Sequence, residues 1–252
     1  MDNKTSVLFI GESWFVHTVE SKGFDSFSFD NYSTGIRYIQ RALSLPEFSF
    51  THLPCHLVES DFPTTAVELR EKYDVILLSD IGANTFLLPM KTFLQVETTP
   101  NKLEMMKEFV LLGGGLGMIG GYLTYMGIEG KGNYKNTVIE EILPVLFQEG
   151  DDRQEIPQGF APDAIDLGHP LLDGFPKEWP RCLGYNKAAA KPDATVLASY
   201  RGDPIIALGT FGKGRTLAYS TDCAPHWSPE EFCNWPYYNI LWQNLVRWLA
   251  KK

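Results

Sequence analysis

The first 150 residues alternate short apolar runs with amphipathic helical stripes, and this alternation constrains the fold more than any other feature. The runs at residues 7–12 and 74–80 are short and continuously apolar, which predicts strands buried on both faces. We expect further strands at residues 48–53 and 116–119. We expect the helices at residues 34–45, 64–73, 101–112 and 136–146. Such an order forms a mostly parallel sheet with helices on both faces and right-handed crossovers.

Local signals mark several of the expected helix ends. Ser33 and Thr34 are typical N-cap residues for the helix at 34–45, and Pro46 would stop it. Gly113 is placed to act as the C-cap of the helix at 101–112.

The pattern changes after Gly150. Residues 151–179 are rich in Pro, Gly and Asp and are expected to form loops, and strands are expected at 195–200, 204–209 and 215–220. The turn at 211–214 predicts that the last two strands form a hairpin. An amphipathic helix at 237–250 closes the chain. Without a repeat, a low-complexity tract or a linker, residues 1–252 are expected to form a single domain.

Charge and composition exclude several classes of partner. The net charge is -9, without a cluster of Lys and Arg, whereas nucleic acids and anionic membranes require a basic patch. The apolar run at residues 7–10 is too short for a signal peptide or a membrane helix, so we expect a cytoplasmic protein. The four cysteines form no CxxC pair, and we expect free thiols in a reducing compartment.

Two glycine-rich motifs resemble cofactor loops in spelling only. Residues 115–120 spell GxGxxG, but they lie between a helix and a strand, whereas a dinucleotide fingerprint follows a strand and opens a helix. Residues 212–215 lack the spacing and the Ser/Thr of a phosphate loop and are better explained as a hairpin turn. The histidines show no HxH, HxxxH or HExxH spacing. We therefore expect no cofactor and no metal.

Functional groups of a parallel sheet gather at the carboxyl ends of its strands. Glu12, His17 and Glu20 follow the first strand and could add carboxylates and an imidazole to a site, or could belong to a solvated loop. Asp222 and His226 follow the last strand. His226 could act as an acid/base group or orient a ligand, or it could simply bond a loop carbonyl.

Aromatic residues lie in or beside the same loops. They could stack on a sugar, form a subunit interface or belong to the core. These residues are Trp14, Phe15, Trp227, Trp235 and Tyr238.

Three features of the chain resemble class I glutamine amidotransferase-like proteins. They are the strand order, the succession of helix, glycine-rich loop, strand and sharp turn at 113–122, and the segment 212–227 with the helix that follows it. The last segment resembles the branch known as putative glutamine amidotransferases and, more distantly, ThuA-like proteins. The resemblance implies an α/β, flavodoxin-like three-layer sandwich with a C-terminal hairpin and helix.

The chain departs from the family pattern at its decisive position. The turn that carries the nucleophile reads roughly Gly-x-Cys-x-Gly, and the matching residues here are Ile119, Gly120 and Gly121. Glycine has no side chain, so no acyl-enzyme can form there and we expect no glutaminase activity. The amides of Gly120 and Gly121 could still form an anion or carbonyl pocket, or the glycines could merely permit a tight turn. The resemblance places His226 where the catalytic histidine would lie.

Three functions remain open at this point: a small-molecule-binding or hydrolytic enzyme, a non-catalytic homologue that binds a ligand or partner, and a homo-oligomeric scaffold. For the first, the catalytic candidates are His226 and Asp222. The ligand-binding candidates are Gly120, Gly121, Tyr122, Glu12, His17 and Trp227. The expected partners are a small molecule and further copies of the chain, not nucleic acid or membrane.

Overall fold

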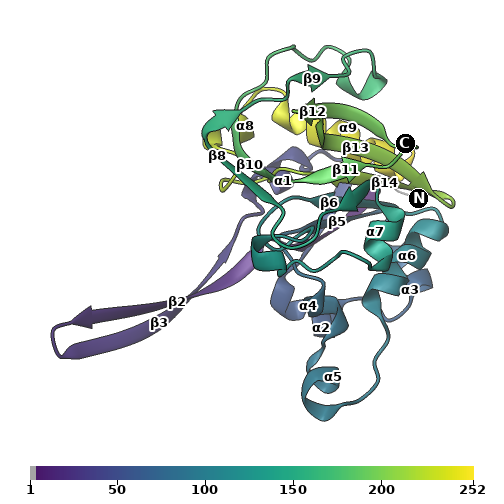
Figure 1. Cartoon of the computed structure of the whole chain (residues 1–252). Helices are drawn as coiled ribbons and strands as arrows, with labels where there is room; N and C mark the ends of the chain where they lie inside the picture. Colours follow the sequence, from purple (N-terminus) through teal and green to yellow (C-terminus); the bar gives the residue numbers. More distant parts are fainter. Residues whose placement is uncertain (1–3) are drawn as a thin grey trace.

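A computed structural model describes residues 4–252 and is built on one large mixed sheet (Figure 1). Its strand order is β4-β1-β5-β6-β14-β13-β12-β9. The first five strands are parallel: β4 (Phe48–Leu53), β1 (Thr5–Gly11), β5 (Val75–Ser79), β6 (Gly115–Ile119) and β14 (Gly214–Tyr219). The others continue antiparallel: β13 (Asp203–Phe211), β12 (Thr195–Tyr200) and β9 (Ala164–Ile165).

Helices cover both faces of this sheet, which makes three layers (Figure 1). One face packs against α1 (Arg37–Ala42), α8 (Glu230–Cys233) and α9 (Tyr238–Ala250). The other packs against α2 (Val58–Asp61), α3 (Ala66–Lys72), α4 (Asn84–Leu87), α6 (Lys102–Leu111) and α7 (Val138–Ile142). The remaining helices are α5 (Met90–Gln95) and the 3₁₀ turns η1 (Cys55–Leu57), η2 (Ile128–Gly130) and η3 (Pro170–Leu172).

The strand residues alternate between the two hydrophobic cores. In β1, Val7 and Phe9 enter the core under α1 and α9, whereas Leu8 and Ile10 enter the opposite core. All four are buried, which explains the continuous apolar run in the sequence. The α/β three-layer class is thereby confirmed. Among residues 4–252, no helix is long and apolar enough to cross a membrane.

Several expected element boundaries are confirmed. The strands at 48–53 and 195–200 match β4 and β12 residue for residue. Asn101 caps α6, accepting hydrogen bonds from the amides of Leu103 and Glu104. The hairpin of β13 and β14 and the closing helix α9 also form as expected.

The segment after β1 differs from its expectation. Instead of a loop and a helix starting at Thr34, β2 (Ser13–Lys22) and β3 (Asp25–Thr34) form an antiparallel arm that projects from the body (Figure 1). Gly23 turns the chain with φ +67°, as a two-residue hairpin turn with glycine in its first central position requires. The helix α1 begins only at Arg37.

Two further expectations fail in the middle of the chain. The expected helix at 136–146 ends at Ile142, because Pro144 disfavours helical conformation in the residue before it; β7 (Val145–Phe147) follows. The expected loops at 151–179 contain β8 (Arg153–Phe160) and β9. Two small antiparallel sheets result, β8 with β10 (Cys182–Asn186) and β7 with β11 (Ala188–Ala190).

Candidate functional site

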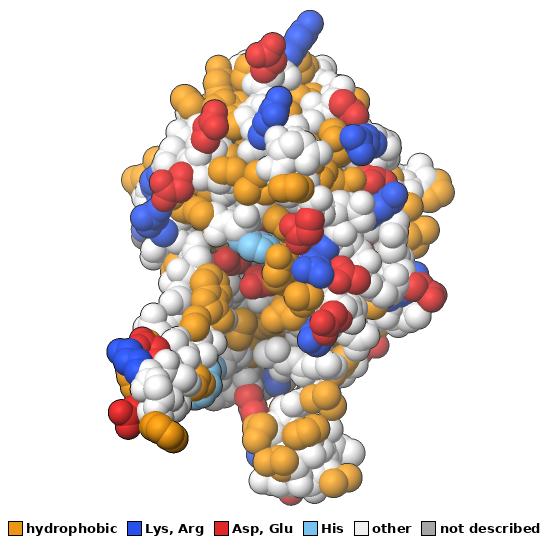
Figure 2. Space-filling model, turned by 60° about the vertical axis from the view of Figure 1, so that its left-hand side comes forward, with side chains coloured by type: hydrophobic (Ala, Val, Ile, Leu, Met, Phe, Trp, Pro, Cys, Tyr) orange, Lys and Arg blue, Asp and Glu red, His pale blue; other side chains and the backbone are white. Residues whose placement is uncertain are grey.

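A pocket of about 670 Å³ opens at the carboxyl ends of the parallel strands. Figure 2 shows a hollow beside the arm in which acidic side chains and a histidine gather. The lining residues are Glu12, Trp14, Thr34, Gly35, Arg37, Tyr38, Asp80, Tyr122, Asp222, Ala224, Pro225, His226 and Glu230.

Three carboxylates reach this pocket from three strand ends. Glu12 follows β1, Asp80 follows β5 and Asp222 follows β14. The backbones of Glu12 and Asp80 adopt left-handed conformations, with φ of 49° and 45°. Non-glycine residues in this region carry strain, and such strain concentrates at functional sites. The fold therefore holds these two carboxylates in place at a conformational cost.

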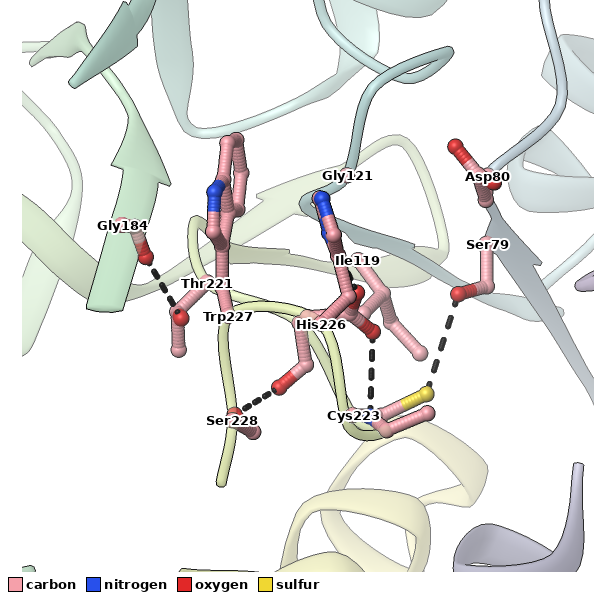
Figure 3. A network of polar contacts seen from close by, with 12 residues as sticks. Ser79, Asp80, Ile119, Gly121, Gly184, Thr221, Cys223, His226, Trp227 and Ser228 are labelled. Atoms are coloured by element: carbon pink, nitrogen blue, oxygen red, sulfur yellow. Dashed lines mark hydrogen bonds and ion pairs between the residues drawn. The ribbon is translucent and has the colours of Figure 1, made fainter. Parts of the chain in front are cut away.

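Glu12 is almost fully buried, with 3% of its surface exposed. Ser79 donates a hydrogen bond to its Oε2 at 2.6 Å, and the Ser79 hydroxyl also lies 3.7 Å from Cys223 Sγ (Figure 3). Burial, and then the negative charges of Asp222 and Asp80, raise the pKa of Glu12 well above its ordinary value. This shift favours the protonated form of the carboxyl group, which can donate a proton to a ligand.

Gly35 makes room for that carboxyl group. A Cβ at position 35 would lie 2.2 Å from Glu12 Oε1, and the Gly35 amide donates a hydrogen bond to the Glu12 carbonyl at 3.0 Å. A side chain at position 35 would displace Glu12 from the pocket.

Asp80 links the pocket to the loop after β6. Its Oδ1 accepts a hydrogen bond from the Leu123 amide at 2.9 Å. Burial and the charge of Asp222 raise its pKa, and they outweigh the opposing effects of Leu123 and His226. Two neighbouring carboxyl groups therefore resist ionising together.

His226 and Asp222 form a pair at the pocket wall. The His226 Nδ1 atom lies 3.3 Å from Asp222 Oδ2, while Asp222 Oδ1 accepts from the Ala224 amide at 3.0 Å. Burial lowers the pKa of His226, but the hydrogen bond and charge of Asp222 outweigh burial and raise it overall. The ring packs edge to face on Tyr122, with centroids 4.1 Å apart. The imidazole is thus oriented, partly exposed and able to exchange a proton.

The loop that carries this pair is tied down by hydroxyl groups. Thr221 donates to the Gly184 carbonyl at 2.8 Å, and Ser228 donates to the Asp222 carbonyl (Figure 3). Trp227 is buried and stacks behind His226, and its indole donates to Glu155 at 3.0 Å. Trp227 therefore supports His226 without lining the pocket.

The turn at Gly120 does not have the expected geometry. No α-helix opens after β6; turns lead to η2. The Gly120 amide donates to the Tyr219 carbonyl at 2.7 Å and the Gly121 amide to Asn186 Oδ1 at 2.9 Å. Both donors are already used inside the protein, so an amide-lined anion pocket does not fit this arrangement. Gly120 is instead required by close packing, since a Cβ there would lie 2.1 Å from the Ser220 carbonyl oxygen.

His17 lies apart from the pocket. It sits on the arm, where it pairs with Asp30, and its side chain is largely exposed. Glu20 pairs with Lys22 on the same arm. The hairpin carries both residues away from the strand end where the sequence had placed them.

Three buried side chains could bring metal-ligand atoms together. Glu12, Asp222 and Cys223 offer ligand atoms within 4.8 Å of one another. Burial and the charges of Glu12 and Asp222 raise the pKa of the Cys223 thiol well above its usual value. The protonated thiol is a poor nucleophile. All four cysteines of the chain are free thiols.

Sequence reasoning missed part of the pocket. Arg37, Tyr38 and Glu230 complete its mouth, where Glu230 accepts from the Tyr38 hydroxyl at 3.1 Å and from Arg37 at 3.3 Å. Their convergence depends on how α1 packs against α8, which no local pattern encodes. Asp80 could have been recognised in the sequence as a candidate, because it lies at the carboxyl end of the strand expected at residues 74–80.

Comparisons with known proteins assign the chain to a family. The model of the GATase1_like family, described as putative glutamine amidotransferase, matches residues 6–251. This chain belongs to that family. The cytoplasmic protein STM3548 from Salmonella typhimurium has 46% identity and a TM-score of 0.92, covering 96% of this chain and 98% of that one. The cytoplasmic protein STM1381 from Salmonella typhimurium LT2 has 44% identity and a TM-score of 0.90, covering 97% and 99%.

A more distant likeness concerns the fold alone. A putative ThuA-like protein from Parabacteroides merdae has 12% identity and a TM-score of 0.57, covering 98% of this chain and 90% of that one. No curated protein matches the chain.

Proposed function

We propose that this member of the GATase1_like family binds a small neutral or cationic molecule bearing hydroxyl or amine groups in the pocket at the strand ends. The observation that carries the proposal is the convergence of Glu12, Asp80 and Asp222 on one cavity. Its volume of about 670 Å³ is in the usual range for small-molecule sites.

The charges of the pocket select the ligand class. Arg37 at the mouth is paired with Glu230, and His226 is paired with Asp222. Within residues 4–252, Glu12 and Asp80 have no ion-pair partner. Where one of these carboxyl groups is ionised, a unit charge 4 Å away interacts with it by about 4 kcal/mol at an effective dielectric constant near 20, attractive for an ammonium and repulsive for an anion. A bound ammonium would therefore favour ionisation of these groups and lower their raised pKa values. Carboxylate ligands, and glutamine through its own carboxylate, are therefore disfavoured.

The same residues support acid–base chemistry. His226, oriented by Asp222, is the proposed proton-transfer group, and Glu12 can donate or accept a proton because burial raises its pKa. Tyr122 and Trp14 offer aromatic surface to the apolar part of the ligand. Any reaction at the site would consist of moving a proton at a ligand hydroxyl or amine.

We propose further that the protein is a single cytoplasmic domain and is not a glutaminase. Gly120 has no side chain at the nucleophile position, and the nearby thiol of Cys223 is buried and protonated. The runner-up is a homo-oligomeric scaffold without a ligand. A pocket lined by the chain's own residues favours the binding function over the scaffold.

A panel of ligands tests this proposal by thermal shift and calorimetry. Polyols and amino alcohols should raise the melting temperature, and dicarboxylates of similar size should not. A ligand at 100 times its Kd adds about 2.7 kcal/mol to the free energy of unfolding. Stabilisation by the dicarboxylates alone would contradict the proposal.

Variants then locate the site. Asp80→Asn keeps the acceptor for the Leu123 amide but removes the charge, and should weaken binding about 10- to 100-fold, since a hydrogen bond to a charged group contributes about 1.5–3 kcal/mol. Glu129→Gln removes an exposed acid outside the pocket and is the matched control. Equal affinities in the two variants would place the ligand elsewhere.

A further inference from the structure

The β2–β3 arm projects from the body (Figure 1) and carries exposed hydrophobic side chains (Figure 2), many of them aromatic. Phe24 at its tip is fully exposed, and the other five aromatic side chains are between 40% and 63% exposed. The six aromatic residues of the arm are Trp14, Phe15, Phe24, Phe27, Phe29 and Tyr32.

The strand register sorts these residues onto two faces. Trp14, Val16, Phe27 and Phe29 share one face, because directly paired residues and every second residue along a strand point to the same side. Phe27 and Phe29 stack there with centroids 6.4 Å apart. The other face carries Phe15 and Tyr32 near the body, where they contact His56, and the exposed Val19 further out. Within residues 4–252, the side chains of the apolar face on the outer part of the arm remain exposed.

A hairpin of this kind is not expected to be stable alone. Two isolated strands are marginal in water and need a further layer or further strands. At about 200 Å² for each whole aromatic side chain, the six residues expose on the order of 700 Å² over the two faces and the tip, of which Trp14, Phe27 and Phe29 contribute about 270 Å² on one face. The largest apolar patch of a typical monomer is about 300–600 Å², whereas a standard-size interface buries about 800 Å² on each partner.

The edges of the arm are also open to pairing. Its ladder runs through ten consecutive residue pairs without a bulge, and residues 13–34 contain no proline and one lysine. Monomeric proteins usually protect such edges with prolines, lysines or bulges. The outer edges of β2 and β3 pair with no other strand in the described chain, so their backbone groups are available to another strand.

We infer that the arm joins two copies of this chain, with β2–β3 of one copy packing beside β2–β3 of the other. A two-fold contact of this type uses the same surface twice, and it would add backbone pairing at the open strand edges to the burial of the aromatic face. Charge opposes it only weakly: Lys22 pairs with Glu20, and Asp25 and Asp30 leave the arm with a formal net charge of -2. An anionic membrane is a poor occupant, because the arm has one lysine and no arginine and the chain carries a net charge of -9.

The test is the mass of the full-length protein in solution, by light scattering and sedimentation at about 1–100 μM. The wild type should have twice the chain mass of 28.4 kDa. Phe27→Ser/Phe29→Ser should be monomeric, with an unchanged circular dichroism spectrum. Phe93→Ser removes an aromatic side chain of α5 that is more exposed than Phe27 or Phe29, and this variant should remain dimeric.

A second variant guards against misfolding of the first. Thr18→Lys keeps every aromatic residue and adds a charge beside Phe29 on the same face, so it should also yield monomers. A wild-type protein that is monomeric at 100 μM would overturn the inference. It would do so equally if that monomer bound to anionic vesicles in a co-sedimentation assay. A dimer that persists in both arm variants, or one that Phe93→Ser also abolishes, would overturn it as well.

Discussion

Replacing Gly120 by cysteine puts a thiol back at the position where the family pattern has its nucleophile, and we expect it to damage the fold without creating a glutaminase. A Cβ at this position would lie 2.1 Å from the Ser220 carbonyl oxygen and 2.5 Å from its carbon. Both are backbone atoms. The Ser220 amide bonds the Ile205 carbonyl at 2.8 Å, and its carbonyl accepts from the Asn186 amide at 2.8 Å, so the segment is held on both sides.

The size of the effect follows from these contacts. Overpacking typically costs about 1–3 kcal/mol, and a backbone hydrogen bond lost to the required shift adds about 1 kcal/mol. The sum of about 2–4 kcal/mol corresponds to a fall of roughly 10 °C in melting temperature for a chain of this size. Urea unfolding and thermal melts measure the loss, and ammonia release from glutamine measures the activity.

Two other glycines, Gly168 in the loop after β9 and Gly121 next to Gly120, provide controls. Gly168→Ala places a Cβ 3.4 Å from a side-chain oxygen of Asp166, and Gly121→Ala places one 3.2 Å from Asp80 Oδ1. Both should cost about 1 kcal/mol or less, because a side chain can move where backbone cannot. A Gly120→Cys protein that melts within about 2 °C of the wild type, or that hydrolyses glutamine, would refute this reasoning.

The remaining predictions concern the pocket. Glu12→Gln should be more stable than the wild type at pH 8 and about equally stable at pH 4. Burial raises the pKa of Glu12 in the folded state, so at pH values between its unfolded-state pKa and its folded-state pKa the folded protein binds more protons than the unfolded chain. The stability of the wild type therefore falls as pH rises above about 4.5, the ordinary pKa of a glutamate. Urea titrations at the two pH values check this, and a larger gain at pH 4 would contradict it. His226→Ala should weaken ligand binding at least tenfold with a near-normal melt, while His17→Ala, on the arm, should leave the calorimetric affinity unchanged.

The sequence predicted the central sheet well for a physical reason. Strands β1, β5 and β6 are buried on both faces, so their apolar runs are continuous and need no partner to be recognised. The arm was missed because its serines and threonines dilute the apolar pattern. Its two strands also depend on contacts outside the segment for their stability.

The pocket was predictable only where it follows strand ends. Glu12, Asp222 and His226 were named from the sequence because parallel strands bring their carboxyl ends to one edge. The hydrogen bond from the Gly121 amide to Asn186 Oδ1 joins residues that are 65 positions apart in the sequence. It depends on tertiary contacts that no local sequence pattern contains. The same holds for Gly35, which has to be glycine because Glu12 folds back over it.

A crystal structure of the full chain with a polyol or amino alcohol from the ligand panel tests the central claim most directly. The account predicts ligand hydroxyl or ammonium groups within about 2.6–3.2 Å of carboxylate oxygens of Glu12, Asp80 or Asp222, with His226 in reach of one of them. A ligand bound outside this pocket, or one whose carboxylate contacts the amides of Gly120 and Gly121, would contradict it.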